Sequence, residues 1–140
     1  MKKIVINQCF GGFGLSDEAC MLYAKLCGFE LYSWIDNTSI KVYGSEKEAR
    51  EKNAMLHYCT KPVKTEDEYD NLENSNDFYW SDHSIERDDV NLVKVVETLG
   101  KKASGRCAML VVVNIPDDVE WEIIEFDGNE HVAEKHRKWN

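Results

Sequence analysis

The sequence predicts an α+β fold: a mixed or antiparallel sheet with about three helices and a C-terminal strand meander, in a single domain, residues 1–140. Its length suits one ordinary domain. Helices are predicted where apolar residues recur at helical spacing, with a capping residue before the segment and a glycine after it. Late in the chain, two strand-like runs flank an Asp-Gly dipeptide at 127–128, the preferred hairpin turn. Consecutive strands without intervening helices are typical of α+β folds.

The N-terminal part predicts one strand and one helix. Residues 3–8 are rich in β-branched residues and predict the first strand, which three glycines at 11, 12 and 14 interrupt. Ser16 is a favourable N-cap, and the acidic residues 17 and 18 suit the first turn of a helix because of its dipole. Gly28 supplies the stop. We therefore expect the first helix between Ser16 and Gly28.

The middle of the chain predicts two short strands, a helix and an acidic segment. Residues 29–44 contain two strand-like runs around an Asp-Asn-Thr-Ser turn. Ser45 and Glu48 form a capping-box pattern for a second helix, which carries Met55, Leu56 and Tyr58 and ends before residue 62. Residues 64–86 show little periodicity and predict an acidic loop or insertion, anchored by the aromatic residues 78–80.

The last third predicts a helix followed by strands. Asp89 caps a helix at 90–99 that Gly100 ends, and we expect its apolar residues to be nearly all buried. Residues 106–116 are strongly apolar and predict a strand in the centre of its sheet. Residues 119–126 predict the next strand, and the hairpin turn leads into a further strand from residue 129.

Charge and composition exclude several classes of protein. The net charge is −9, and residues 66–89, with ten acids and one arginine, account for all of it. The sequence pI of about 4.9 argues against duplex nucleic acid as a partner. The mean hydropathy of −0.51 and the lack of long apolar runs argue against membrane association. Five cysteines without a C-x-x-C pattern indicate a reduced cytoplasm.

The first candidate site is the glycine-rich loop formed by Phe10, Gly11, Gly12, Phe13 and Gly14. Glycines between a strand and a helix expose backbone N–H groups, which favours anions, and aromatic rings can stack on a nucleobase. The loop matches neither of the common phosphate-binding glycine motifs. An equally good interpretation is a tight turn that approaches another part of the fold, with both phenylalanines in the core.

Two arginines are the candidates for bidentate contacts to phosphate. Arg87 lies just before the third helix, and Arg137 lies in the basic stretch EKHRKW near the C-terminus. The alternative for either is a salt bridge to the acidic segment. Arg50 and Arg106 are better explained as solvated or strand-edge side chains.

The sequence gives weaker support for a catalytic site or a metal site. Cys9, at a strand end before a helix N-terminus, is a possible nucleophile, with the base left open among the histidines at 57, 83, 131 and 136. The sequence has no HExxH or paired-cysteine pattern, so we expect no metal and no other cofactor. The acids at 120, 122 and 125 are explained by alternation on a strand that places them in solvent.

Three blocks of the chain resemble a family of phage proteins. They are VINQCFGGFGLSDEA, RDDVNLVKVVETLG and IPDDVEWEIIEFDGNEHVAEKHRKW, and together they cover somewhat under half the chain. In these blocks the chain is similar to the Thoeris anti-defence protein 1 family. It departs from its relatives at Asp89-Val90, where they commonly have Asp-Pro. Residues 29–86 show no resemblance.

The resemblance implies a binding protein and not an enzyme. The family sequesters, without cleaving, glycocyclic ADP-ribose signals in the bacterial host cytoplasm, and some members also bind cyclic oligonucleotides. It forms dimers or hexamers, so a homo-oligomer is implied. The glycine loop, Arg87 and Arg137 are the matching site residues, and we add three residues of the last block to the predicted ligand site: Trp121, Asn129 and His136.

Two other functions remain open at the level of sequence. One is a nucleotide hydrolase that uses Cys9 or a carboxylate. The other is an inhibitor of a defence protein, in which the acidic segment mimics DNA.

Overall fold

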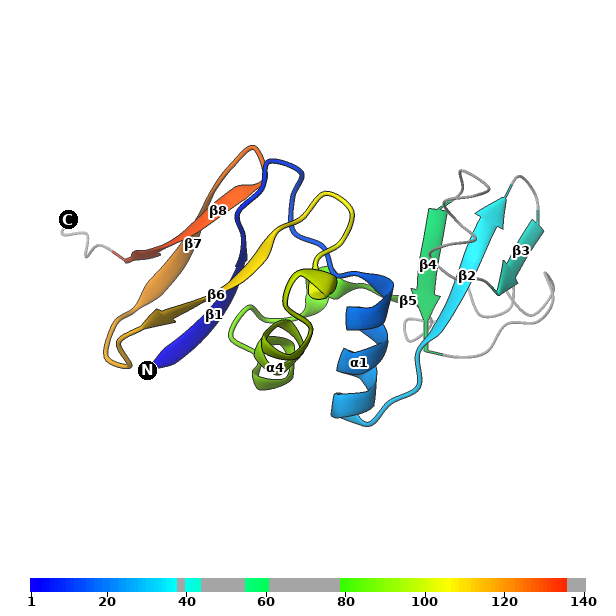
Figure 1. Cartoon of the computed structure of the whole chain (residues 1–140), viewed down its shortest axis with the longest axis horizontal. Helices are drawn as coiled ribbons and strands as arrows, with labels where there is room; N and C mark the ends of the chain where they lie inside the picture. The colour runs from blue at the N-terminus through cyan, green and yellow to red at the C-terminus, as the bar shows by residue number, and fades with distance from the viewer. Residues whose placement is uncertain (38–39, 44–54, 61–78, 136–140) are drawn as a thin grey trace, which may run out of the picture. The chain divides into compact units, whose positions relative to one another are not determined.

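The computed structural model describes residues 1–37, 40–43, 55–60 and 79–135 (Figure 1). Within the chain, two compact units are distinguished: Met1–Tyr23 together with Ile85–Asn140, and Ala24–Ser84. Each unit is α+β or β in its own right, and the chain as a whole contains both helices and antiparallel sheets, which confirms the α+β class. The single domain expected from chain length stays a prediction.

The first unit contains two pairs of antiparallel strands. β1 (Lys2–Asn7) pairs with β6 (Leu110–Ile115) in a register that sets Asn7 opposite Leu110. β7 (Trp121–Phe126) and β8 (Asn129–Glu134) form a hairpin. Its turn residues Asp127 and Gly128 have φ angles of 51° and 88°, as the preferred two-residue hairpin turn requires. The Asp-Gly prediction is therefore confirmed.

Two helices with the expected caps accompany these strands. In α1 (Asp17–Cys27), the Ser16 hydroxyl accepts a hydrogen bond from the Ala19 N–H at 3.1 Å. In α4 (Val90–Leu99), Asp89 Oδ1 accepts from the N–H groups of the second and third helical residues. Asp89 Oδ2 also accepts from the Tyr23 hydroxyl at 3.0 Å. Both helices thus confirm the starts read from the sequence, and a short 3₁₀ turn, Gly100–Ala103, follows α4.

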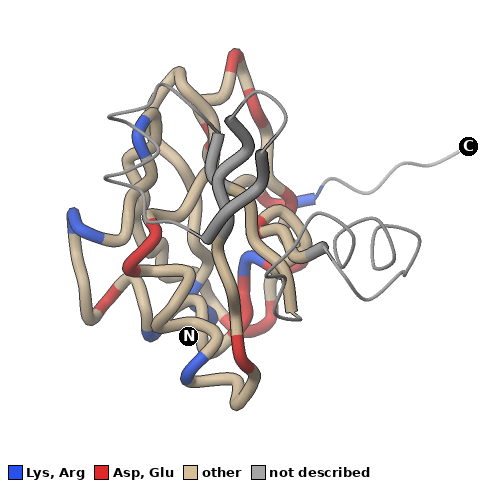
Figure 2. The backbone as a smooth tube through the Cα atoms, turned by 90° about the vertical axis from the view of Figure 1, so that its right-hand side faces the viewer, with Lys and Arg blue, Asp and Glu red and all other residues tan. Residues whose placement is uncertain are grey.

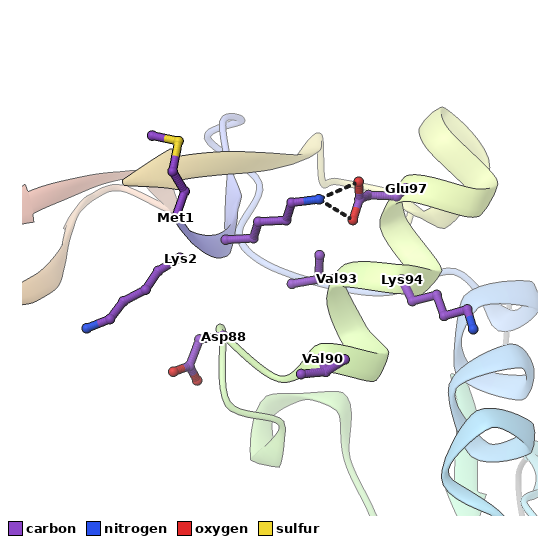
Figure 3. Close-up of a pocket in the computed structure, with 8 residues that line it drawn as sticks. Met1, Lys2, Asp88, Val90, Val93, Lys94 and Glu97 are labelled. Carbon is purple, nitrogen blue, oxygen red and sulfur yellow. Dashed lines mark hydrogen bonds and ion pairs between the residues drawn. The ribbon is translucent and has the colours of Figure 1, made fainter. Parts of the chain in front are cut away.

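The core of this unit lies between β1 and the apolar face of α4. Ile4, Val5 and Ile6 are almost completely buried, as are Leu92 and Val95. Burial of such side chains contributes roughly 1.5–3 kcal/mol each, so these strand and helix faces dominate the stability of the unit. At the exposed rim, the Lys3 ammonium pairs with the Glu97 carboxylate at 3.1 Å, joining β1 to α4 (Figure 3).

The second unit is built on a four-stranded antiparallel sheet in the order β3-β2-β4-β5. Its strands are β2 (Tyr32–Asn37), β3 (Ile40–Tyr43), β4 (Met55–Cys59) and β5 (Tyr79–Trp80). The Trp80 ring lies 5.9 Å from that of Tyr58 and 6.3 Å from that of Phe29, measured between centroids. These contacts bear out the expected aromatic anchor at Trp80. The unit closes with a short 3₁₀ turn, Asp82–Ser84.

Several predictions of secondary structure need correction. Residues 55–59, expected at the end of the second helix, form strand β4, because pairing with β2 on one side and β5 on the other overrides the local helix signal. The capping box at 45 and 48 lies outside the described residues. β6 was expected at the centre of its sheet, yet β1 is its one strand partner among the described residues. The expected meander is a β7–β8 hairpin, since β6 does not pair with β7.

Charges of both signs occur along the described backbone (Figure 2). The glutamates at 120, 122 and 125 are exposed, as expected. Alternation alone does not account for all three, because Glu125 lies on the opposite face of β7 from Glu122. Most of the acidic run falls outside the described residues. No helix in the described part of the chain is long and apolar enough to cross a membrane.

Candidate functional site

An open depression lies where the end of β1 meets the start of β6 and the β7–β8 hairpin. Its volume is about 480 Å³, within the range of roughly 300–1,000 Å³ that small-molecule sites occupy. Its walls combine aromatic, thioether and polar side chains: Gln8, Phe10, Met109, Phe126, Asn129, Glu130 and His131. We call it the hairpin depression.

Exposed apolar side chains concentrate at this depression. Phe10 is 62% exposed, Met109 51% and Phe126 76%. Ile124, 42% exposed, lies two residues before Phe126 on the same face of β7. Large apolar groups gathered on a surface, with polar groups around them, mark an interaction site more often than they serve the fold. The depression is therefore the strongest candidate for ligand binding in the first unit.

Three polar side chains complete the walls. Gln8, Asn129 and His131 make no side-chain hydrogen bond to any described residue, so their polar atoms are available to a ligand. Asn129 and His131 lie on the same face of β8. Across the hairpin, Asn129 pairs with Phe126 and His131 with Ile124. Amide, imidazole and aromatic groups thus share one surface, which suits recognition of a flat heteroaromatic ring.

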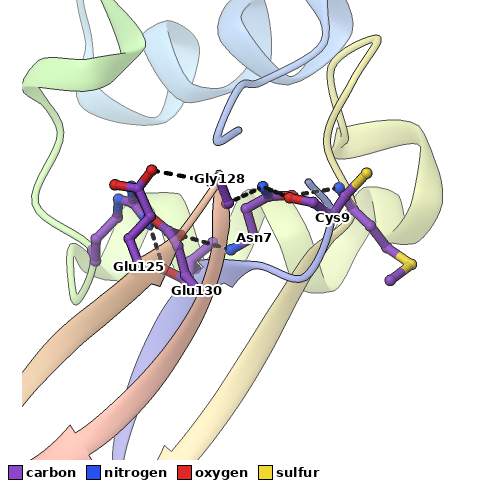
Figure 4. A network of polar contacts seen from close by, with 8 residues as sticks. Asn7, Cys9, Glu125, Gly128 and Glu130 are labelled. Carbon is purple, nitrogen blue, oxygen red and sulfur yellow. Dashed lines mark hydrogen bonds and ion pairs between the residues drawn. The ribbon is translucent and has the colours of Figure 1, made fainter. Parts of the chain in front are cut away.

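Asn7 connects the segments that form the walls of the depression through hydrogen bonds, part of the polar network in Figure 4. Its side chain is completely buried and donates from Nδ2 to the carbonyl oxygens of Cys9 at 2.7 Å and Gly128 at 2.8 Å. Its Oδ1 accepts from the Met109 N–H at 2.8 Å. One amide therefore ties the glycine loop, the start of β6 and the hairpin turn to the end of β1. Asn7 is a positioning residue for the depression and does not line it.

A buried ion pair supports the same region. The Arg87 guanidinium donates to both oxygens of Glu130, at 2.6 and 2.9 Å, and Glu130 Oε1 also accepts from the backbone N–H of Asn7 at 2.8 Å. Arg87 further donates to the Val5 carbonyl at 3.3 Å, and its Cζ lies 3.7 Å above the centroid of the Phe13 ring. The Arg87 and Glu130 side chains are 20% and 8% exposed. The bidentate face of Arg87 is thus occupied by a carboxylate of the protein.

The glycine loop is packed against the fold itself. A Cβ on Gly11 would lie 2.1 Å from the Cys107 carbonyl oxygen, and one on Gly128 would lie 2.7 Å from both Phe10 O and Gly12 N. The Gly14 carbonyl accepts a hydrogen bond from the Gly105 N–H at 2.8 Å. The loop backbone is therefore approached by the segment before β6 and by the hairpin turn, which agrees with the interpretation of the loop as a tight turn against another part of the fold.

The structure brings together only part of the predicted ligand site. Phe10 and Asn129 line the depression, whereas Phe13 is buried beneath Arg87. Trp121 lies on the opposite face of β7 from Phe126 and does not line the depression. His136 and Arg137 lie outside the described residues. Arg87 was expected to reach a phosphate or the acidic segment, and its observed partner is Glu130 instead.

Sequence reasoning missed Asn7, which supports the site, and five of the seven residues that line it: Gln8, Met109, Phe126, Glu130 and His131. Asn7 and Glu130 are polar residues within strands, and nothing in the local pattern distinguishes them from solvated side chains. Phe126 and Met109 stand in strand-like apolar runs, where large side chains are usually buried. One usable signal was present: Phe126 stands directly before the Asp-Gly turn, at the exposed end of a hairpin.

The described residues do not form a catalytic group around Cys9 or a metal-binding group. Cys9 is partly buried and makes no side-chain hydrogen bond to a described histidine. All five cysteines are free thiols. Within the residues that the structure describes, no group of three or more histidine, cysteine or acidic side chains is placed to hold a metal ion.

Comparison of the chain with protein-family models, curated proteins and solved structures gives no match.

Proposed function

We propose that the protein binds a nucleotide-type signal in the hairpin depression and holds it without reacting it. The resemblance to the Thoeris anti-defence protein 1 family indicates the ligand class, a cyclic ADP-ribose such as glycocyclic ADP-ribose. Binding would take place in the cytoplasm of a phage-infected bacterium. A homo-oligomer and binding of cyclic oligonucleotides belong to the same proposal.

The observation that carries the proposal is the composition of the depression's walls. Two exposed phenylalanine rings offer faces on which a base can stack, a contact worth roughly 1–3 kcal/mol. The Gln8 and Asn129 carboxamides each present a donor and an acceptor, the pairing that matches the edge of adenine. This surface favours the base of a nucleotide over its phosphates.

The diphosphate then has to lie outside the depression. Arg87 is held by Glu130 and would have to leave a buried ion pair to reach a phosphate. The sequence directly after β8 carries Lys135, Arg137 and Lys138, whose positive charges suit a diphosphate. Because Arg137 is outside the described residues, its phosphate contact stays a prediction from the sequence.

Retention without cleavage is supported by the chemistry of the lining. Apart from the imidazole of His131 and the Glu130 carboxylate, the lining consists of amides, phenylalanine rings and a thioether, which do not transfer protons or act as nucleophiles near neutral pH. The Glu130 carboxylate already accepts three hydrogen bonds, two of them from Arg87. Such walls bind and orient a ligand, which is what sequestration requires.

Replacement of one stacking ring tests the proposal. In Phe126→Ser we expect the dissociation constant for glycocyclic ADP-ribose to rise about 10-fold to 100-fold, because one stacking face is lost. The free energy of unfolding should change little, since the ring is 76% exposed. Isothermal titration calorimetry measures the affinity, and urea denaturation the stability.

A matched control uses another exposed apolar residue of the same unit. Val90, 81% exposed at the start of α4, does not line the hairpin depression, so Val90→Ser should bind the nucleotide as tightly as the wild type. Unchanged affinity in Phe126→Ser, alongside wild-type protein that binds, would place the ligand elsewhere on the protein.

A further inference from the structure

Asn129 lies beside one of the stacking rings of the hairpin depression. It begins β8 and pairs across the hairpin with Phe126, and both residues line the depression. Side chains that lie directly opposite each other on one face of an antiparallel pair have Cβ atoms about 4.5–5.5 Å apart. A base that stacks on the Phe126 ring can therefore present its edge to the Asn129 carboxamide. Gln8, the other carboxamide of the depression, is exposed and longer, so fixing it against a ligand costs more rotamer entropy.

The charged groups of this region are already paired with each other. Both Glu130 oxygens accept hydrogen bonds from Arg87, at 2.6 and 2.9 Å, and Oε1 also accepts from the backbone N–H of Asn7. Among the described residues, no other acid and no lysine or arginine lines the depression. The groups left for hydrogen bonds to a base are therefore the two carboxamides and the imidazole of His131.

This set of groups distinguishes between the common purines. The N6–N7 edge of adenine presents one donor beside one acceptor, which a carboxamide matches with its own oxygen and amino group. The O6–N7 edge of guanine or hypoxanthine presents two acceptors, so a carboxamide sets its oxygen against O6, and the usual partner is a free arginine or lysine. The N1 and N2 groups of guanine donate and require an available carboxylate. The described lining supplies neither partner.

We propose that the hairpin depression selects 6-aminopurines over 6-oxopurines and that Asn129 determines this preference. The base stacks on Phe126, and the Asn129 carboxamide donates to N7 and accepts from the 6-amino group. Because the contact involves the base alone, it does not depend on how the ribose and phosphate groups are linked, and linear as well as cyclic adenine nucleotides bind. This selectivity rests on the proposed function, which places the ligand in the same depression. It excludes cyclic oligonucleotides whose bases are all guanine.

ADP-ribose and its hypoxanthine counterpart, IDP-ribose, test the preference, because they share the same diphosphate and differ only in the base. Isothermal titration calorimetry at pH 8, where imidazole side chains are neutral, should give a dissociation constant roughly 10-fold to 100-fold lower for ADP-ribose. Asn129→Leu should weaken ADP-ribose binding by a similar factor and leave IDP-ribose binding nearly unchanged, so that the preference disappears. Asn114→Leu, at an exposed position of β6 outside the depression, should keep the preference.

The ratio of the two affinities separates base recognition from loss of folding, because a merely structural role of Asn129 would weaken both ligands equally. The Asn129 side chain makes no hydrogen bond to a described residue, so the hairpin is retained in the variant. Equal affinities in the wild type, a preference that survives in Asn129→Leu, or binding of glycocyclic ADP-ribose without binding of ADP-ribose would overturn the selectivity and leave the proposed function intact. No binding of any of the three ligands would overturn both proposals.

Discussion

Glu130→Ala is expected to lower the free energy of unfolding by about 3–5 kcal/mol, the usual cost of removing one partner from a buried ion pair. The substitution takes away the acceptor for both guanidinium nitrogens of Arg87 and for the Asn7 N–H. Arg87 is then left above the Phe13 ring without a counter-charge. Urea denaturation followed by circular dichroism measures the loss.

Glu122→Ala, an exposed glutamate on the same hairpin, is the matched control and should change stability by less than about 0.5 kcal/mol. A double variant, Arg87→Ala with Glu130→Ala, should lose less than the sum of the two single losses, because the two side chains contact each other. Equal effects of the two glutamate substitutions would show that the ion pair does not support the fold.

Asn7→Asp is expected to cost about 2–5 kcal/mol although it preserves the shape of the side chain. The carbonyls of Cys9 and Gly128 would lose their donor and face an oxygen instead, in a completely buried position. Each buried polar group left without its partner costs roughly 1–3 kcal/mol. Because the amide ties the walls of the hairpin depression, nucleotide affinity should fall as well.

The pH dependence of this loss provides a second check. Burial raises the pKa of the introduced carboxyl above its value in the unfolded chain. Relative to the wild type, the variant should therefore be least impaired in acid and lose stability as the pH rises towards neutrality. Asn114→Asp, the same change at an exposed position of β6, should show neither effect. A loss in Asn7→Asp no larger than in Asn114→Asp would contradict the role given to the buried amide.

Local chemistry was enough to predict the helices and the hairpin. Ser16 and Asp89 satisfy backbone N–H groups at helix starts, and the Asp-Gly turn adopts the positive φ angles that its residues tolerate. These signals lie within a few residues of the structure they determine. The segment at 55–59 shows the limit of such reasoning, since its strand pairing with β2 decides its conformation.

The candidate site depends on contacts between distant parts of the sequence. Asn7 meets Glu130 across 123 positions, and Arg87 meets the same carboxylate across 43. The sequence offers several acids as partners for one arginine, and only the fold selects among them. The glycine loop was found from its composition, but composition alone does not distinguish a ligand from the Cys107 and Gly128 backbone that approaches it.

The most direct test of a protein that holds its ligand unreacted is recovery of that ligand. The purified chain is mixed with glycocyclic ADP-ribose below its own molar concentration, the free ligand is filtered away, and the protein is denatured by heat. We expect the filtrate before heating to contain little ligand and the intact ligand to be released after heating, as judged by liquid chromatography with mass spectrometry. With Phe126→Ser, most of the ligand should remain in the first filtrate. Release of a cleaved product, or no depletion by the wild-type chain, would contradict the account.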